Sequence, residues 1–150
     1  ASPGLGDVYK RQAVCLSVGQ HKCDIAMAGL TINEEREEYV TFSDPYYKAS
    51  QRLVTLADDT AFDDCKDAAS VEEILKGLSA SDKIGGQQGT TAQYFIEGSD
   101  DWGFEGFPAE WVPYKSASLA VQDMINGNLK YVLIDAAPAA SITKAINAMQ

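Results

Sequence analysis

The residues that could do chemistry lie in three separate places of the 150-residue chain. Thr31 and Arg36 stand where an apolar, strand-like segment gives way to a helix start, and a guanidinium can hold a carboxylate with two parallel hydrogen bonds. Gly89-Thr90-Thr91 follows a predicted strand and opens a predicted helix, whose first N–H groups attract anions. Asp135 directly follows the apolar run 131–134, where a carboxylate could receive an ammonium. Together these groups predict a site for both ends of an amino acid.

Each of these groups also has a purely structural interpretation. Arg36 could be a surface cation paired with Glu34, Glu37 or Glu38. The threonines after Gly89 could serve only as a helix N-cap, and Asp135 could cap the last helix in the same way. The combination of three groups therefore carries the prediction, and no single group does.

Patterns typical of catalysis or metal binding are missing from the sequence. It has no Gly-x-Ser-x-Gly elbow, no HExxH motif and no suggestively spaced Cys/His pair. The three cysteines, Cys15, Cys23 and Cys65, have no metal-ligand spacing, and their odd number implies no disulfide framework. His21 lies in a polar turn. The abundant carboxylates leave a glycosidase-type pair open, but none stands out from solvated charge. We expect a binding protein without a cofactor or metal, and not an enzyme.

The composition narrows the partners further. The net charge of −10 and the pI near 4.4 make nucleic acid an unlikely partner, because such a surface repels phosphates. No apolar run reaches the length of a membrane span, and no secretory signal peptide is visible at the N-terminus. The apolar share of 45% is that of a globular protein.

Alternating strand and helix patterns position the three groups. Strands are predicted at 23–28, 51–57, 83–86, 111–114 and 131–134. Helices are predicted to end at Gly19, to begin at Asn33, and to cover 70–77, 91–96, a stretch from Ser116 or Ser118 to Gly127, and a last one with Pro138 in its first turn. This order favours an α/β fold with a largely parallel sheet, with Pro113 on an edge strand.

The chain divides by composition into three segments. Residues 1–12, ASPGLGDVYKRQ, show no period and look like vector or adapter read-through, so we expect them to be a non-native scar. After Ala57 the sequence becomes acidic, which suggests a crossover. We therefore predict that the chain crosses after residue 57 from a first part, 13–57, into a second lobe, 58–150.

Three ordered motifs resemble one family. The stretch 24–47, DIAMAGLTINEEREEYVTFSDPYY, is similar to the signature of bacterial extracellular solute-binding proteins of family 3, the polar amino-acid receptors of ABC importers. The stretches IGGQQGTTAQYF and LAVQDMINGNLKYVLIDAAPAA resemble the next two landmarks of that family. The resemblance implies a periplasmic-binding-protein-like type II α/β fold, with two lobes and a hinge, of which this chain would be an internal fragment.

The resemblance also implies roles for particular residues. Thr31 and Arg36 match the carboxylate binders, and Gly29 lies on the adjoining pocket wall. Thr91, with its neighbour Thr90, matches the helix start that donates to the same carboxylate from the other lobe. Asp135 matches the acidic residue that receives the ammonium.

Partners and location follow from the same resemblance. It implies an extracytoplasmic protein, periplasmic or a lipoprotein, that binds a free amino acid and docks on an ABC permease, and that meets the membrane only through an anchor or that permease. Two alternatives share the fold: a cyclohexadienyl or arogenate dehydratase-like enzyme, and the ligand-sensing domain of a receptor. Lys130, where the family usually has an acidic residue, and Gly86, where an apolar residue is common, depart from the pattern.

Overall fold

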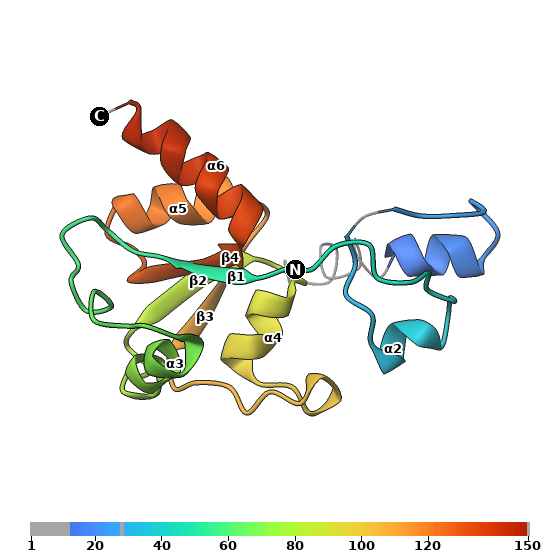
Figure 1. The fold of residues 1–150 in the computed structure, drawn as a ribbon, viewed down its shortest axis with the longest axis horizontal. Helices are drawn as coiled ribbons and strands as arrows, with labels where there is room; N and C mark the ends of the chain where they lie inside the picture. The colour runs from blue at the N-terminus through green and yellow to red at the C-terminus, as the bar shows by residue number, and fades with distance from the viewer. Residues whose placement is uncertain (1–12, 28, 150) are drawn as a thin grey trace, which may run out of the picture.

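A four-stranded sheet forms the centre of the larger part of the molecule (Figure 1). The computed structural model describes residues 13–27 and 29–149. The strands are β1 (Gln51–Val54), β2 (Lys83–Gln87), β3 (Glu110–Tyr114) and β4 (Tyr131–Asp135), and their order in the sheet is β1-β4-β2-β3. β2 runs parallel to both β3 and β4, whereas β1 pairs antiparallel with β4. The predicted α/β fold with a largely parallel sheet is confirmed.

Helices cover both faces of this sheet. Helices α5 (Ala117–Ile125) and α6 (Ala136–Asn147) lie on one face, and α3 (Ala68–Lys76) and α4 (Thr91–Glu97) lie on the other (Figure 1). A short 3-10 helix, η1 (Asp100–Trp102), follows α4. Crossovers through helices are what parallel strands require, because a short turn cannot connect them.

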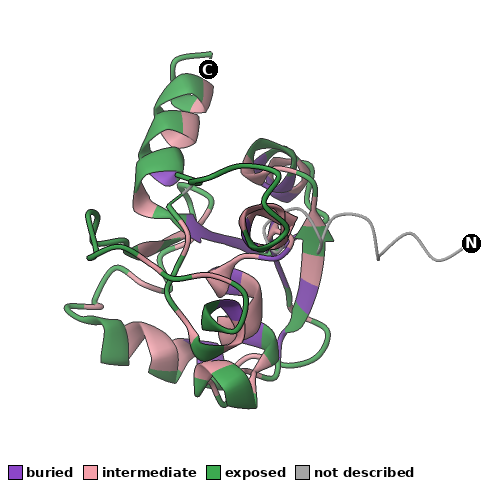
Figure 2. Ribbon diagram, turned by 90° about the vertical axis from the view of Figure 1, so that its right-hand side faces the viewer, coloured by how far each residue is buried: buried purple, intermediate pink, exposed green. Residues whose placement is uncertain are grey.

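The alternation of side chains along β4 divides the core into two layers. Val132 and Ile134 pack in the cluster that includes Met124 of α5. Tyr131 and Leu133 point the other way and pack in the cluster with Leu75 and Ile96. Successive strand residues face opposite sides, so the run Tyr131–Ile134 is buried throughout, as predicted. Figure 2 shows the buried residues along the strands and the exposed outer faces of the helices.

Gly86 allows a large aromatic residue to reach the sheet. A Cβ atom at this position would lie 2.4 Å from Cη2 of Trp111 and 2.6 Å from the carbonyl oxygen of Leu133. The indole of Trp111 therefore covers the backbone where a larger residue would stand. This explains why glycine replaces the apolar residue that the resemblance led us to expect.

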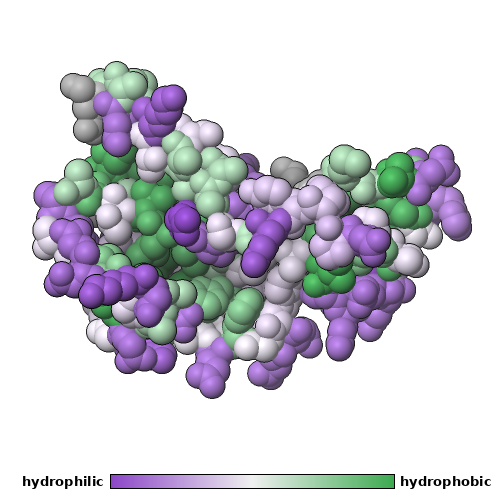
Figure 3. Space-filling model, in the orientation of Figure 1, coloured by the Kyte–Doolittle hydropathy of each residue, from purple (hydrophilic) through white to green (hydrophobic). Residues whose placement is uncertain are grey.

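The smaller part comprises residues 13–50 and is joined to the sheet through the segment that leads into β1 (Figure 1). Residues 13–19 are helical, as predicted, and α2 (Glu34–Glu37) follows Asn33, whose side chain accepts from the N–H of Arg36. In the space-filling view the two parts meet at a narrow waist (Figure 3). At the waist, Thr31 and Arg36 of the smaller part lie beside Thr91 and Trp102 of the larger part.

The strand predicted at 23–28 is wrong over the residues that are described there, 23–27. They form no strand, and Ile25 and Met27 are 79% and 81% exposed. A strand needs a neighbour that shares its backbone hydrogen bonds. No strand of the described chain pairs with this segment.

Two helix or strand boundaries differ from the predicted ones, and a third decides between two predicted cap residues. α3 begins at Ala68, two residues before the predicted start, because Asp67 and Ser70 form a capping box there. β1 ends at Val54, where its pairing with Val132 ends. Ser116, and not Ser118, caps α5, and Gly127 follows its end at φ +84°. Proline at position 113 lies in β3, an edge strand, as predicted.

The remaining sequence predictions concern segments and thiols. Cys15 is buried, Cys65 is half-buried and Cys23 is exposed. None of the helices in the described residues is both long and apolar enough to cross a membrane. Residues 1–12 lie outside the described residues, and the lobe boundary at residue 57 stays a prediction.

Candidate ligand-binding site

Arg36 is a buried cation that no described carboxylate neutralises. Its side chain is largely covered, since the residue is 6% exposed. Nη1 donates to the carbonyl oxygen of Thr31 at 2.8 Å, and the guanidinium carbon lies 5.4 Å from the ring centroid of Trp102. None of the ion pairs among the described residues involves Arg36. The alternative of a surface cation paired with a neighbouring glutamate is therefore wrong.

Thr31 joins Arg36 to the start of α4. The hydroxyl oxygens of Thr31 and Thr91 lie 3.3 Å apart, and either can be the donor. Thr31 reaches this position because its segment runs along the waist, and Thr91 reaches it as the first residue of α4. Hydroxyls both donate and accept, so a ligand oxygen can be held by either one. The structure thus brings Thr31, Arg36 and Thr91 together, as the sequence predicted.

The turn before α4 is built by glycine and by side-chain hydrogen bonds. Gly89 adopts φ +69°, which glycine tolerates without steric cost, and its N–H donates to Oε1 of Gln93 at 2.8 Å. Thr90 stands at the N-cap position, yet its hydroxyl donates to the carbonyl oxygen of Gln87 at 2.7 Å and makes no cap bond. The interpretation of Thr90 as an ordinary N-cap side chain is therefore wrong.

Asp135 ends β4 and directly precedes α6. It occupies the N-cap position of that helix, but its side chain makes no cap hydrogen bond. Instead, its Oδ1 accepts from Nε2 of Gln51, the residue opposite it in the β1–β4 ladder. Both residues line a small cavity of about 60 Å³ together with Thr90 and Pro138. The exposed carboxylate of Asp135 is thus oriented toward a cavity by a neighbouring strand.

Gly29 lies on a different surface of the waist. It lines a hollow of about 400 Å³ with Thr31, Tyr46 and Tyr47. The N–H of Gly29 donates to the hydroxyl of Tyr46 at 2.9 Å, and its φ of +56° is one that favours glycine. Both tyrosines that line the hollow are exposed.

The predicted residues therefore form two clusters that meet at one peptide. Thr31, Arg36 and Thr91 form the cationic cluster, and Asp135 and Thr90 belong to the acidic one. Thr90 and Thr91 are consecutive, and consecutive Cα atoms lie about 3.8 Å apart. The two clusters are therefore adjacent at the start of α4. Gly29 stands beside Thr31 and contacts neither Arg36 nor Asp135 in the hydrogen bonds described.

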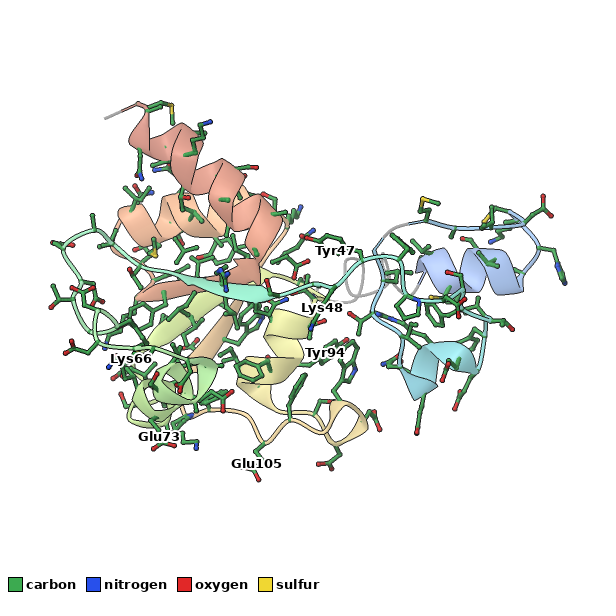
Figure 4. All side chains as sticks on the ribbon, in the orientation of Figure 1. Tyr47, Lys48, Lys66, Glu73, Tyr94 and Glu105 are labelled. Carbon is green, nitrogen blue, oxygen red and sulfur yellow. The ribbon has the colours of Figure 1, made fainter. Side chains whose placement is uncertain are left out.

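Two residues of these clusters were not expected from the sequence. Gln51 looked like the first residue of a strand, and only the antiparallel register places it opposite Asp135. Trp102 stacks on Tyr94 with ring centroids 4.9 Å apart, and it also contacts Arg36 from the other part of the molecule. Figure 4 shows Tyr94 on α4 at the waist, near Tyr47 and Lys48 of the segment before β1. The sequence signal that could have found Trp102 was an aromatic residue in the loop that follows the predicted helix 91–96.

Lys130, the departure at the start of β4, lies at the opposite end of the strand from Asp135. Its Nζ is 2.7 Å from Oδ1 of Asp82. The hydrogen bond from Lys130 is the largest cause that lowers the pKa of Asp82 to about 2, and the N–H and hydroxyl of Ser79 lower it further. The lysine therefore joins the starts of β2 and β4 and does not reach the candidate site.

The fold is that of a class of extracellular proteins that bind small solutes. The model of the family described as bacterial extracellular solute-binding proteins, family 3, matches residues 8–147. The chain belongs to this family, as the three sequence motifs suggested.

Known relatives in this class are described as amino-acid-binding proteins. The chain is 33% identical over 125 residues to the histidine-binding periplasmic protein of Escherichia coli (strain K12), which covers 83% of this chain and 40% of the relative. It resembles an ancestral arginine-binding protein bound to arginine, with 29% identity, a TM-score of 0.61, and coverage of 89% of this chain and 52% of that one.

A third relative connects the family to an enzyme. An ancestral amino acid-binding protein, described as a precursor of cyclohexadienyl dehydratase, is 26% identical with a TM-score of 0.65, covering 90% of this chain and 54% of that structure. The periplasmic-binding-protein-like fold predicted from the sequence is thereby confirmed. The chain spans about half or less of the length of these relatives.

Proposed function

We propose that this chain carries the amino-acid-binding site of an extracytoplasmic substrate-binding protein of an ABC importer. The single observation that carries the proposal is the buried guanidinium of Arg36, which has a carbonyl oxygen and an indole as its described partners and no carboxylate. A buried cation without a counter-ion is costly. A ligand carboxylate would supply that counter-ion.

The carboxylate of the ligand would lie between the two parts of the chain. Arg36 would bind it as a fork, and Thr31 and Thr91 would donate their hydroxyls from the two sides. A carboxylate oxygen would then take the place of the present contact between the two hydroxyls. The hydroxyl of Thr90 already donates to Gln87, so its backbone N–H, at the start of α4, is the donor this residue would offer.

The ammonium of the ligand would lie at Asp135. A carboxylate at the end of a parallel strand, held toward a cavity by Gln51, is suited to receive it. Gly29 would form part of the wall of the neighbouring hollow, where a ligand side chain has room. Binding would favour the arrangement with both clusters close, because only that arrangement offers both sets of contacts.

The ligand would be a free amino acid, and histidine, arginine and lysine are the first candidates. Relatives are described as binding histidine and arginine, and a neighbour in fold from Wolinella succinogenes was solved with lysine. The permease of an ABC importer would be the protein partner. The family description and the periplasmic relatives support a location outside the cytoplasm.

A dehydratase activity is the second candidate, because one similar protein is described as a precursor of cyclohexadienyl dehydratase. Such an enzyme needs an acid or base aimed at its substrate. In the described residues, Asp135 is the carboxylate that lines the cavity beside α4, and here it is assigned to the ammonium. We therefore propose a binding protein and not an enzyme.

A thermal-shift panel of the twenty amino acids tests the proposal on the protein expressed from its complete reading frame. A ligand at about one hundred times its Kd adds roughly 2.7 kcal/mol, which is worth several degrees at about 2–4 °C per kcal/mol for a protein of this size. The shift should be lost in Asp135→Ala and in Arg36→Ala. Glu110→Gln, an exposed change on β3, is the matched control and should keep it.

The outcomes separate the candidates. A shift with one or a few amino acids, lost in both site variants, supports the importer receptor. No shift with any amino acid removes the free-amino-acid proposal. Turnover of prephenate by the same preparation would instead favour the dehydratase.

A further inference from the structure

A small polar cavity lies at the junction of β1, β4 and the turn before α4. It holds about 60 Å³ and is lined by Gln51, Gln87, Thr90, Ile134, Asp135 and Pro138. Sites for whole small molecules usually measure roughly 300–1,000 Å³. This cavity therefore fits one polar group of a ligand and not its side chain.

The orientation of the Gln51 amide is fixed by its neighbour. An ionised carboxylate only accepts hydrogen bonds, so the group that faces Oδ1 of Asp135 must be the donor, Nε2. The oxygen Oε1 then points away from Asp135. This oxygen is buried and has no hydrogen-bond partner in the described chain. Buried polar atoms without a partner are uncommon and costly, so this one calls for a donor.

The hydroxyl of Thr90 offers a further acceptor on the same cavity. Its proton is donated to the carbonyl oxygen of Gln87, so only its lone pairs remain for a ligand. Gln51, Thr90 and Asp135 thus line one small space, and each of them carries an oxygen that can accept a hydrogen bond. A group with several N–H donors and a positive charge matches this set, and an ammonium is such a group.

We infer that Gln51 is a further ligand-contacting residue, whose Oε1 accepts a second N–H of the ligand's ammonium while its Nε2 holds the carboxylate of Asp135 that accepts the first. The inference rests on the proposed function and deepens it. It assigns the site a preference for a primary ammonium, since a nitrogen with two methyl groups keeps only one N–H. The β1–β4 register creates this pair by placing Gln51 opposite Asp135.

The test measures how much the ligand loses when its nitrogen is methylated, in wild type and in Gln51→Met. The probes are L-histidine, L-arginine and L-lysine, each beside its Nα,Nα-dimethyl form, with affinity measured by calorimetry on the protein from its complete reading frame. The bulk of the two methyl groups weakens binding in both proteins. We call the loss of affinity on dimethylation the methylation penalty. Only the difference in this penalty between wild type and Gln51→Met reports the hydrogen bond to Gln51. We expect the penalty to shrink by about tenfold in Gln51→Met, the value of one hydrogen bond to a charged group.

Two control variants keep the result interpretable. Gln122→Met makes the same change on the exposed side of α5 and should leave the penalty as in wild type. Gln51→Glu keeps an acceptor oxygen but loses the Nε2 donor to Asp135, so it should bind the unmethylated ligand more weakly than wild type and still discriminate against the dimethyl form. Far-ultraviolet circular dichroism checks that each variant is folded.

The failures of the inference and of the proposed function look different. If wild type binds none of the unmethylated probes, the proposed function fails and this inference fails with it. If wild type binds but Gln51→Met shows an unchanged penalty, only the role of Gln51 is overturned. Should Gln51→Met bind too weakly to measure, the methylation penalty of Gln51→Glu decides: a penalty as large as in wild type supports the acceptor role, and a penalty about tenfold smaller contradicts it.

Discussion

The hydroxyl oxygens of Thr31 and Thr91 lie 3.3 Å apart although 60 positions separate them in the chain. One comes from the segment before α2, and the other is the first residue of α4. This contact crosses the waist between the two parts, beside Arg36. The two residues that were predicted to hold one carboxylate thus already face each other.

Replacing both threonines should show whether they act on the same ligand oxygen. Thr31→Val and Thr91→Val keep the shape of each side chain and remove its hydroxyl. We expect each to weaken amino-acid binding by about tenfold, the cost of a hydrogen bond to a charged group. The fold-loss of affinity in the double variant should be smaller than the product of the two single fold-losses, because groups that share a partner are coupled. Calorimetry on the four proteins measures the coupling, and Thr60→Val in the exposed loop after β1 is the control.

Arg36→Lys should bind far more weakly than wild type, although the charge is kept. A lysine cannot form the two parallel hydrogen bonds of a guanidinium. We expect a loss of at least tenfold in affinity, and a larger loss in Arg36→Met. Without ligand, Arg36→Met should be as stable as wild type or more stable, since replacing a buried ion by an apolar residue is often neutral or stabilising. A large fall in its melting temperature would contradict the view of Arg36 as an unneutralised cation.

Trp102 should stabilise Arg36 through its ring face. Trp102→Leu removes both this contact and the stack on Tyr94. We expect a loss of about 1–2 kcal/mol in the free energy of unfolding, from the sum of the cation–π and aromatic contributions. Trp102→Phe keeps a ring and should lose less. Urea unfolding of the two variants measures the difference, and equal losses would be against a specific role for the ring.

Gly86→Ala should destabilise the fold strongly for a single methyl group. The new Cβ would meet the indole of Trp111 and the carbonyl oxygen of Leu133, and a backbone atom cannot move aside. Overpacking of a filled core costs typically about 1–3 kcal/mol. The matched control is Gly77→Ala, at the end of α3, where φ is −79° and the nearest atom to the new Cβ would be the carbonyl oxygen of Ile74 at 3.3 Å. Chemical denaturation compares the two, and an equal effect would show that the close approach of Trp111 is not tight.

Acid should remove a stabilising contribution from Asp82 that depends on Lys130. The pKa of Asp82 is lowered from 3.8 to about 2, first by the hydrogen bond from Lys130. A carboxyl group with a lowered pKa in the folded state stabilises it above its unfolded pKa, and this contribution is lost as the pH falls through the folded pKa. The stability difference between wild type and Lys130→Met should therefore be present at pH 5 and shrink toward pH 2.

The control for this acid effect is Lys144→Met on the exposed side of α6. It removes the same charge from a lysine for which no ion pair is described. Its stability difference from wild type should not follow the titration of Asp82. Urea titrations at several pH values measure both variants. A Lys130→Met difference that is constant down to pH 2 would count against the ion pair.

The order and type of most elements followed from the sequence alone, because they depend on local patterns. The apolar run Tyr131–Ile134, the edge position of Pro113 and the N-cap at Asn33 are each set by a few neighbouring residues. The family was also visible locally, in three ordered motifs. The chemistry of the site, a guanidinium with hydroxyls and a separate carboxylate, could be read from residue types.

Only the tertiary structure decided which groups meet and which segments form strands. The segment 23–27 has a strand-like sequence, but pairing requires a neighbour, and no described strand provides one. Gln51 and Asp135 are 84 positions apart in the chain. They face each other because β1 and β4 pair in one particular antiparallel register. Trp102 lies under Arg36 because the chain folds back at the waist. Such contacts join residues far apart in the chain, and local sequence patterns do not encode them.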